Sequence, residues 1–254
     1  MRLKFLGTGT SQGIPIIGSH HPVCLSTNPK DKRLRASVII TLDNDKKILI
    51  DCGPDFRQQM LANHEEQVDA VLITHEHNDH VIGLDDLRPL IFKNKMEMPL
   101  YCQERVGKEI KFRFPYAFAE EKYPGSPSFT IERATEHFEV FGEEITSIDV
   151  MHSALPILGY KLRNMAYVTD ASHISDIEKE KLKNLDFFII NCLRKEQPHH
   201  SHFILPEVLE LVKELKPKMT YLTHISHLLG FHDDLVAELP SHVQPAYDGL
   251  EIEF

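Results

Sequence analysis

Hydrophobic residues in the first half of the chain fall into short runs bounded by polar residues and glycines, a pattern typical of strands. The runs nearest the N-terminus are Leu3–Leu6, Ala36–Leu42 and Lys46–Asp51. A turn at residues 43–45 separates the second run from the third. The run Val68–Thr74 is almost entirely apolar, which predicts a buried strand. Pro54 stands directly before residues 55–63 and fits the first turn of a helix there.

The second half of the chain repeats this rhythm of strands followed by helices. Its strand-like runs are Glu143–Met151, Ile157–Leu162, Met165–Thr169, Phe187–Asn191 and Met219–His224. Ser175–Asn184 and Pro206–Leu215 instead have apolar residues at helical spacing. Strands that alternate with helices predict a layered α/β domain. Because no Gly/Ser tract or long like-charge run interrupts the chain, we expect residues 1–254 to form one domain.

Residues 104–128 have the least regular pattern. They include FRFPYAF and YPGSPSF, which combine aromatic residues with prolines and a glycine. Such a segment is either a loop or lid beside a substrate or an ordinary packed loop, and the sequence favours the two about equally.

The composition is that of an ordinary globular protein, with 42% hydrophobic and 26% charged residues. The cysteines Cys24, Cys52, Cys102 and Cys192 form no CxxC pair, which favours reduced thiols over a disulfide framework. The N-terminal segment contains no readable signal peptide, and no run of about 18 apolar residues could span a bilayer. We therefore expect a cytoplasmic protein without a membrane partner.

Charge and histidine content narrow the function. The net charge of −10 argues against broad contact with a nucleic-acid backbone, because such contact requires lysine and arginine. A phosphate substrate stays open, since a bound metal ion sets its own local field. The 16 histidines are more unusual. They cluster at positions 20/21, 75/77/80, 199/200/202 and 224/227, so we expect the chemistry there.

The strongest motif is HxHxDH, at the carboxyl end of the predicted strand Val68–Thr74. Its potential metal ligands are His75, His77, Asp79 and His80. Imidazole nitrogens and carboxylate oxygens suit zinc, iron and manganese. A strand-to-helix turn can direct the first two side chains to one metal ion and the last two to a second.

Two metal sites need more ligands than this motif supplies. Three candidates stand at the ends of predicted strands, namely His152, Asp170 and His224. Each alone would more often be a surface or capping residue. Together with HxHxDH, they support one another as parts of one centre.

With these positions filled in order, the chain resembles the metallo-β-lactamase superfamily. The pattern of that family is HxHxDH, a distal histidine, an aspartate that bridges the metals and a final histidine. LIDCG at residues 49–53 matches a strand-end motif of the same family. The resemblance extends over nearly the whole chain and implies a four-layered αββα sandwich, with the metals at its rim.

Within the superfamily, the chain is most similar to the phosphonate-pathway cyclic phosphodiesterase branch and, more broadly, to the branch that includes the tRNA 3′-processing endonuclease. The segments that carry this likeness are GTGTSQGIP (7–15), MHSALPILGY (151–160), SHFILPEVLEL (201–211), THISH (223–227) and the terminal YDGLEIEF. The resemblance therefore implies a phosphodiesterase for a small phosphodiester, with cyclic ones as candidates.

The resemblance also implies a role for each ligand. The first metal ion would be bound by His75, His77 and His152, and the second by Asp79, His80 and His224. Asp170 would bridge the two ions, so it and Asp79 count among the catalytic residues. A metal lowers the pKa of its water from about 15.7 to roughly 7. A hydroxide bridging the ions would then attack phosphorus in line.

His202, in PHHSHF, matches a histidine that this branch places near the scissile phosphate. The resemblance therefore implies that it is a general acid or a phosphate ligand. The alternative is a solvent-facing histidine before the helix that starts at Pro206. We expect the neighbouring His199 and His200 to lie at the surface.

A structural zinc site is also part of the resemblance. Members of the branch bind this zinc through a CxCxxC loop and a histidine near the THISH segment. Here Ser19 and His21 occupy the first two cysteine positions, while Cys24 and His227 match the pattern. Either His21, Cys24 and His227 bind zinc, with His20 or water as the fourth ligand, or the loop is held by packing alone.

Other functions stay open. A tRNA-processing nuclease would carry a long basic Gly/Pro-rich arm, which the sequence lacks. A thioester or lactone hydrolase would use the same metals but would not need His202. A non-catalytic carrier, as in quinone cofactor biosynthesis, is disfavoured by the complete ligand set. The ligand types admit zinc, manganese or iron as the two divalent ions. The resemblance adds a homodimer as the expected assembly.

Overall fold

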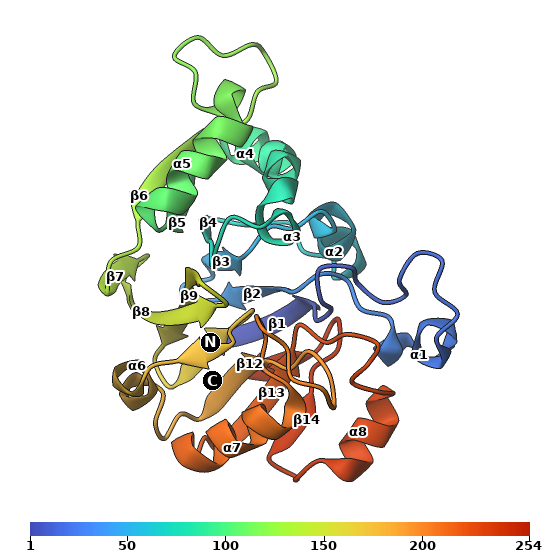
Figure 1. Cartoon of the computed structure of the whole chain (residues 1–254). Coiled ribbons are helices and arrows are strands. Elements are labelled where there is room, and N and C mark those ends of the chain that lie inside the picture. The colour runs from blue at the N-terminus through green and yellow to red at the C-terminus, as the bar shows by residue number, and fades with distance from the viewer.

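The computed structural model describes residues 1–254 and contains two β-sheets that pack face to face (Figure 1). The strands of the first sheet are β1 (Arg2–Gly7), β2 (Ser37–Thr41), β3 (Lys47–Ile50), β4 (Ala70–Leu72), β5 (Met98–Cys102), β6 (Phe129–Arg133) and β15 (Glu251–Glu253). Their order is β15-β1-β2-β3-β4-β5-β6. The pairs from β3 to β6 are parallel, so the carboxyl ends of these strands share one edge.

The second sheet contains strands from the remainder of the chain. They are β7 (His137–Val140), β8 (Glu143–His152), β9 (Leu155–Leu162), β10 (Met165–Val168), β11 (His173–Ile174), β12 (Phe187–Asn191), β13 (Met219–Thr223) and β14 (Val243–Pro245). Their order is β11-β8-β9-β10-β12-β13-β14, and β7 pairs with β8.

Helices lie on the outer side of each sheet (Figure 1). The α-helices are α1 (Pro22–Leu25), α2 (Phe56–Ala62), α3 (Asn78–Val81), α4 (Arg88–Asn94), α5 (Glu104–Arg113), α6 (Asp176–Lys181), α7 (Leu205–Leu215) and α8 (His232–Glu238). Three short 3₁₀ helices are η1 (Pro29–Asp31), η2 (Ile82–Leu87) and η3 (Pro115–Ala117). None of the helices has the length and apolar character that a bilayer crossing requires.

Three hydrophobic clusters fill the spaces between the layers. One cluster joins the first sheet to its helices, and it includes Leu49 of β3, Phe56 of α2 and Ile110 of α5. A second lies between the two sheets. The third joins the second sheet to α7 and α8. Three such interfaces require four layers, so the αββα sandwich expected from the sequence is confirmed.

The alternation of side chains along single strands produces these interfaces. On β2, Val38 and Ile40 belong to the cluster between the sheets, while Ile39 belongs to the cluster under the helices. Successive side chains of a strand point to opposite faces. A strand that is apolar at every position therefore serves both clusters, which explains the unbroken apolar runs in the sequence.

Most predicted elements are confirmed within one or two residues at each end, and Phe187–Asn191 is matched at both ends. The strand observed within the predicted range Val68–Thr74 is shorter than expected, since β4 covers only 70–72. The structure also contains β5, β6 and β7, which the sequence pattern did not indicate. The proline in β5 and the largely unburied positions of β6 and β7 left these segments without a clear apolar run.

The interpretation of residues 104–128 as a loop is wrong for its first part. Residues 104–113 form α5, whose buried face is Val106, Gly107 and Ile110. Apart from the exposed Phe112, charged residues cover the rest of this helix, so its apolar content was too low to stand out. Only residues 118–128 lack a regular element between η3 and β6.

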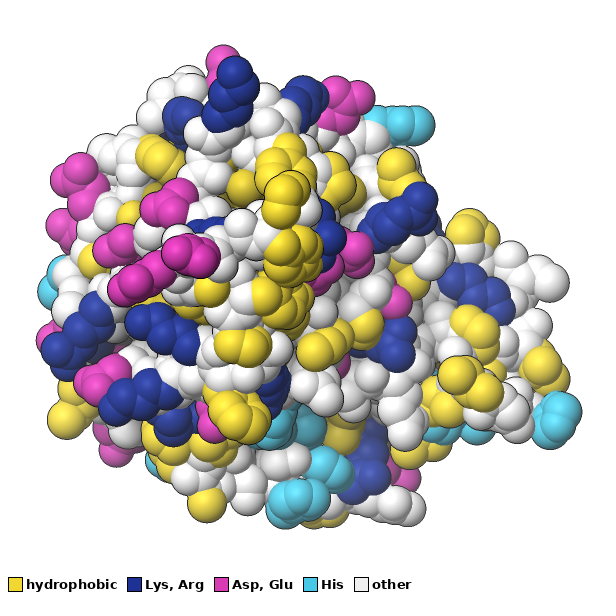
Figure 2. All heavy atoms as spheres, turned by 90° about the horizontal axis from the view of Figure 1, so that it is seen from above, with side chains coloured by type: hydrophobic (Ala, Val, Ile, Leu, Met, Phe, Trp, Pro, Cys, Tyr) yellow, Lys and Arg dark blue, Asp and Glu magenta, His cyan; other side chains and the backbone are white.

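The face seen from above the first sheet is mixed in character. Figure 2 shows hydrophobic side chains gathered along its middle, with basic and acidic groups on both sides, a group of histidines at the lower edge and further histidines around the rim. Exposed hydrophobic residues on elements at this end of the molecule include Ile82, Phe92 and Phe112. The homodimer expected from the sequence stays a prediction.

Candidate metal centre

The HxHxDH segment forms the turn between β4 and α3. His75 follows the end of β4, His77 is the N-cap residue of α3, and Asp79 and His80 lie in its first turn. Because the segment leaves an extended strand and enters a helix, its side chains separate into two sets. His75 Nε2 and His77 Nδ1 lie 3.0 Å apart on one side.

The first set is completed by the last residue of β8. Ligand atoms of His75, His77 and His152 all lie within 4.8 Å of one another. His152 Nδ1 donates to the backbone oxygens of Asp170 at 2.7 Å and of Ser201 at 2.8 Å. This fixes the ring and leaves Nε2 free to bind a metal ion.

The second set combines the other half of HxHxDH with two strand-end residues of the second sheet. Ligand atoms of Asp79, His80, Asp170 and His224 also lie within 4.8 Å of one another. His80 Nε2 is 3.2 Å from both Asp79 Oδ2 and Asp170 Oδ2, and His224 Nε2 is 3.0 Å from Asp170 Oδ1. The seven predicted ligands are therefore brought together as two adjacent groups of three and four.

These residues fit divalent metal ions. The Nε2 atoms of His80 and His224 are buried and have no hydrogen-bond partner, although carboxylate oxygens lie close to both. Buried polar atoms are rarely left unsatisfied. Nitrogen and oxygen atoms that face a shared point without bonding to one another are the donor set that a cation requires.

The electrostatics of the second set also favour positive charge. Burial opposes the charged form of His80, yet Asp79, Asp170 and Asp51 raise its pKa well above the usual value. Burial likewise opposes the charge of His224, but Asp170 raises its pKa to about 9. Burial raises the pKa of Asp170, while the nearby His224 and His80 outweigh it and hold that pKa well below its usual value. A bound cation would displace these protons.

Asp51, in the LIDCG segment, supports the centre without belonging to either set. Its Oδ2 lies 2.6 Å from His80 Nδ1 and accepts from the Thr74 hydroxyl at 2.8 Å. Its Oδ1 accepts from the Thr74 backbone N–H at 2.8 Å. It therefore orients His80 and anchors the end of β4. The sequence indicated the motif but not this role.

Two arginines of α5 hold the HxHxDH turn from the outside. Arg105 pairs with Glu76 and donates to the backbone oxygen of Pro156 at 2.7 Å. Arg113 donates to the Asn78 side chain at 3.1 Å. These contacts were not predicted, because the apolar pattern of residues 104–113 did not indicate a helix.

His202 reaches the centre from the loop before α7. Its Nε2 lies 3.0 Å from Asp170 Oδ1. Burial lowers the pKa of this histidine to about 4, against the opposing effect of Asp170. The solvent-facing alternative for His202 is therefore wrong. Of its neighbours, His200 is exposed as expected, but His199 is half-buried and its Nδ1 lies 3.2 Å from His202 Nδ1.

The suggested structural zinc site is only partly assembled. The rings of His21 and His227 lie 4.7 Å apart between centroids. His21 Nδ1 accepts from the Val23 backbone N–H at 3.3 Å as the N-cap of α1. Cys24 is buried, and no group of three ligand atoms within 4.8 Å of one another includes it. Zinc binding there stays a prediction.

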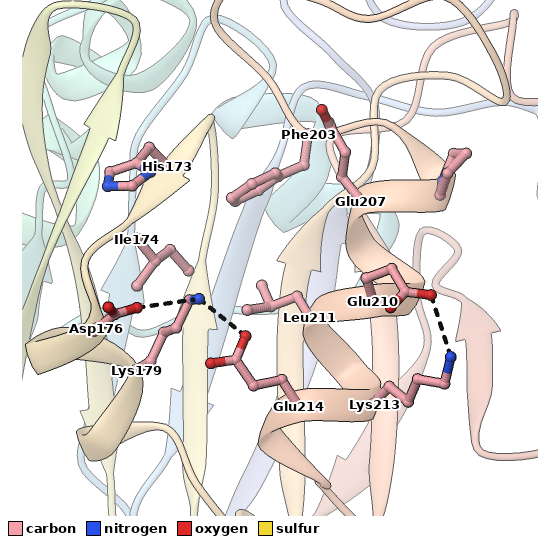
Figure 3. Close-up of a pocket in the computed structure, with 11 residues that line it drawn as sticks. His173, Ile174, Asp176, Lys179, Phe203, Glu207, Glu210, Leu211, Lys213 and Glu214 are labelled. Atoms are coloured by element: carbon pink, nitrogen blue, oxygen red, sulfur yellow. Dashed lines mark hydrogen bonds and ion pairs between the residues drawn. The ribbon is translucent and has the colours of Figure 1, made fainter.

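A separate cavity of about 710 Å³ lies between α6, α7 and β11 (Figure 3). Its lining includes His173, Phe203 and Leu211 but none of the predicted metal ligands. Both lysines of the lining are paired with glutamates of α7, Lys179 with Glu214 at 2.9 Å and Lys213 with Glu210 at 3.3 Å. The candidate centre is therefore distinct from this cavity.

Comparison with known proteins decides the family. A model of the β-lactamase superfamily domain matches residues 46–225, which contain all seven ligand positions. The chain belongs to the metallo-β-lactamase superfamily. Divalent metal ions are implied by this fold, and most of the superfamily are hydrolases.

The relatives of this superfamily member are diverse in name. A crystal structure of a diphosphatase from the PhnP family has 39% sequence identity and a TM-score of 0.92, covering 100% of this chain and 97% of that one. An octanoyltransferase from Porphyromonas gingivalis is 40% identical over 253 residues, which is 99% of this chain and 51% of that protein. The exodeoxyribonuclease YycJ from Bacillus anthracis is 26% identical over 158 residues, 58% of this chain and 54% of that protein.

Two conclusions follow from these comparisons. The likeness to the diphosphatase confirms the PhnP-like branch that the sequence motifs indicated. The chain spans about half the length of the two curated relatives, so their names describe proteins with a large part that this chain does not match.

Proposed function

We propose that this metallo-β-lactamase superfamily hydrolase is a phosphodiesterase that cleaves a small phosphodiester. The observation that carries the proposal is the position of His202. Its Nε2 lies 3.0 Å from Asp170, a member of the second ligand group whose ligand atom also lies within 4.8 Å of one of His152 in the first. A diphosphatase and an exodeoxyribonuclease among the relatives support chemistry at phosphorus. The net charge of −10 favours a small substrate over a nucleic acid.

The ligand roles follow from the two groups. The first group would hold one ion through His75, His77 and His152, and the second would hold another through Asp79, His80 and His224. Asp170, whose ligand atom also lies within 4.8 Å of one of His152, would bridge them. When bound, the ions supply the Lewis acidity that activates water and stabilises charge on phosphoryl oxygens. Zinc and manganese are the metals that we would test first.

His202 provides what the ligands cannot. As phosphorus accepts a new oxygen, the departing oxygen gains negative charge and needs a proton or a hydrogen bond. His202 Nε2 faces the centre and can donate at that oxygen. An ester with a poor leaving group depends most on this proton.

The test is turnover of bis(p-nitrophenyl) phosphate and of a ribose 2′,3′-cyclic phosphate by protein loaded with zinc or manganese. We expect turnover of both, its loss in Asp170→Ala, and a decrease of about a hundredfold in His202→Ala on the cyclic phosphate. Metal analysis accompanies each variant. No turnover with either metal, despite two ions bound per chain, would refute the phosphodiesterase.

Acyl hydrolysis is the second candidate, because the relative with 40% identity is named an octanoyltransferase. Since the chain matches only half of that protein, the name can describe either half. An octanoyl thioester is the discriminating substrate. Its hydrolysis at a rate unaffected by His202→Ala, without turnover of the phosphodiesters, would favour acyl chemistry.

A further inference from the structure

Ser201 lies between His152, a ligand of the first group, and His202. The residue is buried, with 6% of its surface exposed. Its backbone oxygen accepts from His152 Nδ1 at 2.8 Å. Its hydroxyl lies 3.0 Å from His202 Nδ1 and 3.2 Å from His199 Nδ1. One residue therefore contacts both His152 of the first ligand group and His202, the proposed proton donor.

The hydrogen-bond partners determine which nitrogen of His202 carries the proton. Nε2 lies 3.0 Å from Asp170 Oδ1, a carboxylate oxygen that can only accept, so Nε2 carries hydrogen. In a neutral imidazole the other nitrogen is then an acceptor. His202 Nδ1 therefore needs a donor on the side that faces away from the metal ligands.

Two groups face His202 Nδ1, and one of them is already engaged as an acceptor. His199 Nδ1 is 3.2 Å away, but it receives the backbone N–H of Ser201 at 3.4 Å. The Ser201 hydroxyl has one proton and lies closer, at 3.0 Å. The Ser201 hydroxyl is therefore the donor that satisfies His202 Nδ1. His199 Nδ1 lies on the other side of this hydroxyl, at 3.2 Å.

We propose that Ser201 is a positioning residue, whose hydroxyl fixes the His202 tautomer that presents Nε2–H to the departing oxygen. This inference rests on the proposed role of His202. Without the hydroxyl, the His202 ring can turn or exchange its proton to Nδ1, and fewer molecules are ready to donate. The backbone contact to His152 survives any side-chain change, so metal binding is retained.

The experiment compares Ser201→Ala with Ser201→Thr, which keeps a hydroxyl, and with Ser172→Ala as a matched control. Ser172 is a serine of the same rim, but its hydroxyl donates to Met151 O at 3.0 Å and does not contact His202. Metal content, KM and kcat are measured on the cyclic phosphate, a substrate with a poor leaving group, and on bis(p-nitrophenyl) phosphate, which has a good one.

We expect Ser201→Ala to keep its metal and its KM and to lose about tenfold in kcat on the cyclic phosphate, the effect of one hydrogen bond of about 1.4 kcal/mol. The loss on bis(p-nitrophenyl) phosphate is expected to be much smaller. Ser201→Thr should restore most of kcat, and Ser172→Ala should match the wild type. In the His202→Ala background, Ser201→Ala should cost nothing further, because both act through one proton.

Three results would overturn the inference. They are an equal loss on both substrates, a loss explained by missing metal, and an additive loss in the double variant. An intact kcat in Ser201→Ala, beside a strong defect in His202→Ala, would refute the role of Ser201 alone. An intact kcat in His202→Ala, beside an inactive Asp170→Ala, would instead refute the proposed role of His202.

Discussion

At the residue scale, the metal ligands are positioned by groups that do not themselves face the metals. Asp51 orients His80, and backbone oxygens orient His152. Three of the residues concerned have left-handed backbone conformations, with φ of 63° at Asp51, 56° at Asp170 and 50° at His224. Non-glycine residues rarely adopt this region, and such strain tends to concentrate at functional sites.

A histidine away from the centre makes the stability depend on pH. His232, at the start of α8, is buried beside cationic residues. Burial, followed by the charges of Arg33 and Lys30, lowers the pKa of His232 to about 4, and the opposing carboxylates of Asp233 and Asp31 do not compensate. The unfolded chain binds this proton near pH 6.5. The stabilisation from neutral His232 is therefore complete above about pH 6.5 and is lost as the pH falls toward about 4.

We accordingly predict that His232→Gln flattens the loss of stability between pH 7 and pH 4.5. The measurement is the free energy of unfolding by denaturant at several pH values, for wild type and variant with the same metal content. The comparison isolates one histidine, because the others are common to both proteins. Substitution of the exposed His137 is the control. Parallel pH curves for wild type and His232→Gln would contradict the prediction.

At the element scale, two segments cross at very short distance beneath the metal centre. The Cys52 N–H donates to His80 O at 2.7 Å, and the Gly83 N–H donates to Cys52 O at 2.9 Å. A Cβ atom at Gly83 would lie 2.0 Å from Gly53 O, and one at Gly53 would lie 2.1 Å from Asp79 O. Glycine is required at both positions because backbone oxygens occupy the space. This contact fixes α3 and η2 against the loop after β3.

We predict that Gly83→Ala moves the HxHxDH turn and impairs metal binding. Overpacking of this kind costs about 1–3 kcal/mol or more, and the clash is with backbone rather than with a flexible side chain. The readouts are thermal stability and metal content after dialysis, with a decrease of at least about tenfold in metal affinity expected.

The control for this change is Gly107→Ala in α5. There a Cβ would meet the Ile131 side chain at 2.8 Å, which can shift, and alanine favours a helix. Its metal affinity should stay near that of the wild type. Equal metal affinity in Gly83→Ala and wild type would show that the crossing does not position the ligands.

At the scale of the whole molecule, the two sheets are joined by hydrogen bonds next to the centre as well as by the hydrophobic cluster between them. The buried Tyr160 hydroxyl donates to Ile73 O at 2.7 Å, and Leu158 N–H donates to Thr74 O at 3.1 Å. These bonds link β9 to the end of β4, directly before His75. They bring ligands from the two sheets to the same rim.

We predict that Tyr160→Phe lowers the free energy of unfolding by about 1–3 kcal/mol, because it leaves the Ile73 oxygen buried without a partner. Equilibrium unfolding in urea measures the change. Tyr167→Phe is a matched control, since the Tyr167 hydroxyl is buried and has no hydrogen-bond partner. That control should be neutral or stabilising. Equal losses in both variants would assign the effect to packing rather than to the hydrogen bond between sheets.

The sequence by itself determined the layered fold and the residue types of the centre. Apolar runs reveal strands and helices because burial imposes a period on the chain. HxHxDH was readable because four of its ligands lie within six residues, and strand ends located His152, Asp170 and His224. The family resemblance supplied their order and added His202.

Only the tertiary structure decided how these residues meet and what holds them. Asp51 is 29 positions from His80, and Ser201 is 49 positions from His152, yet each pair is in hydrogen-bond contact. Contacts of this kind leave no periodic trace in the chain, because either partner alone looks like an ordinary polar residue. The pairing of the two sheets sets these distances, and with them the tautomers and backbone strain on which the chemistry depends.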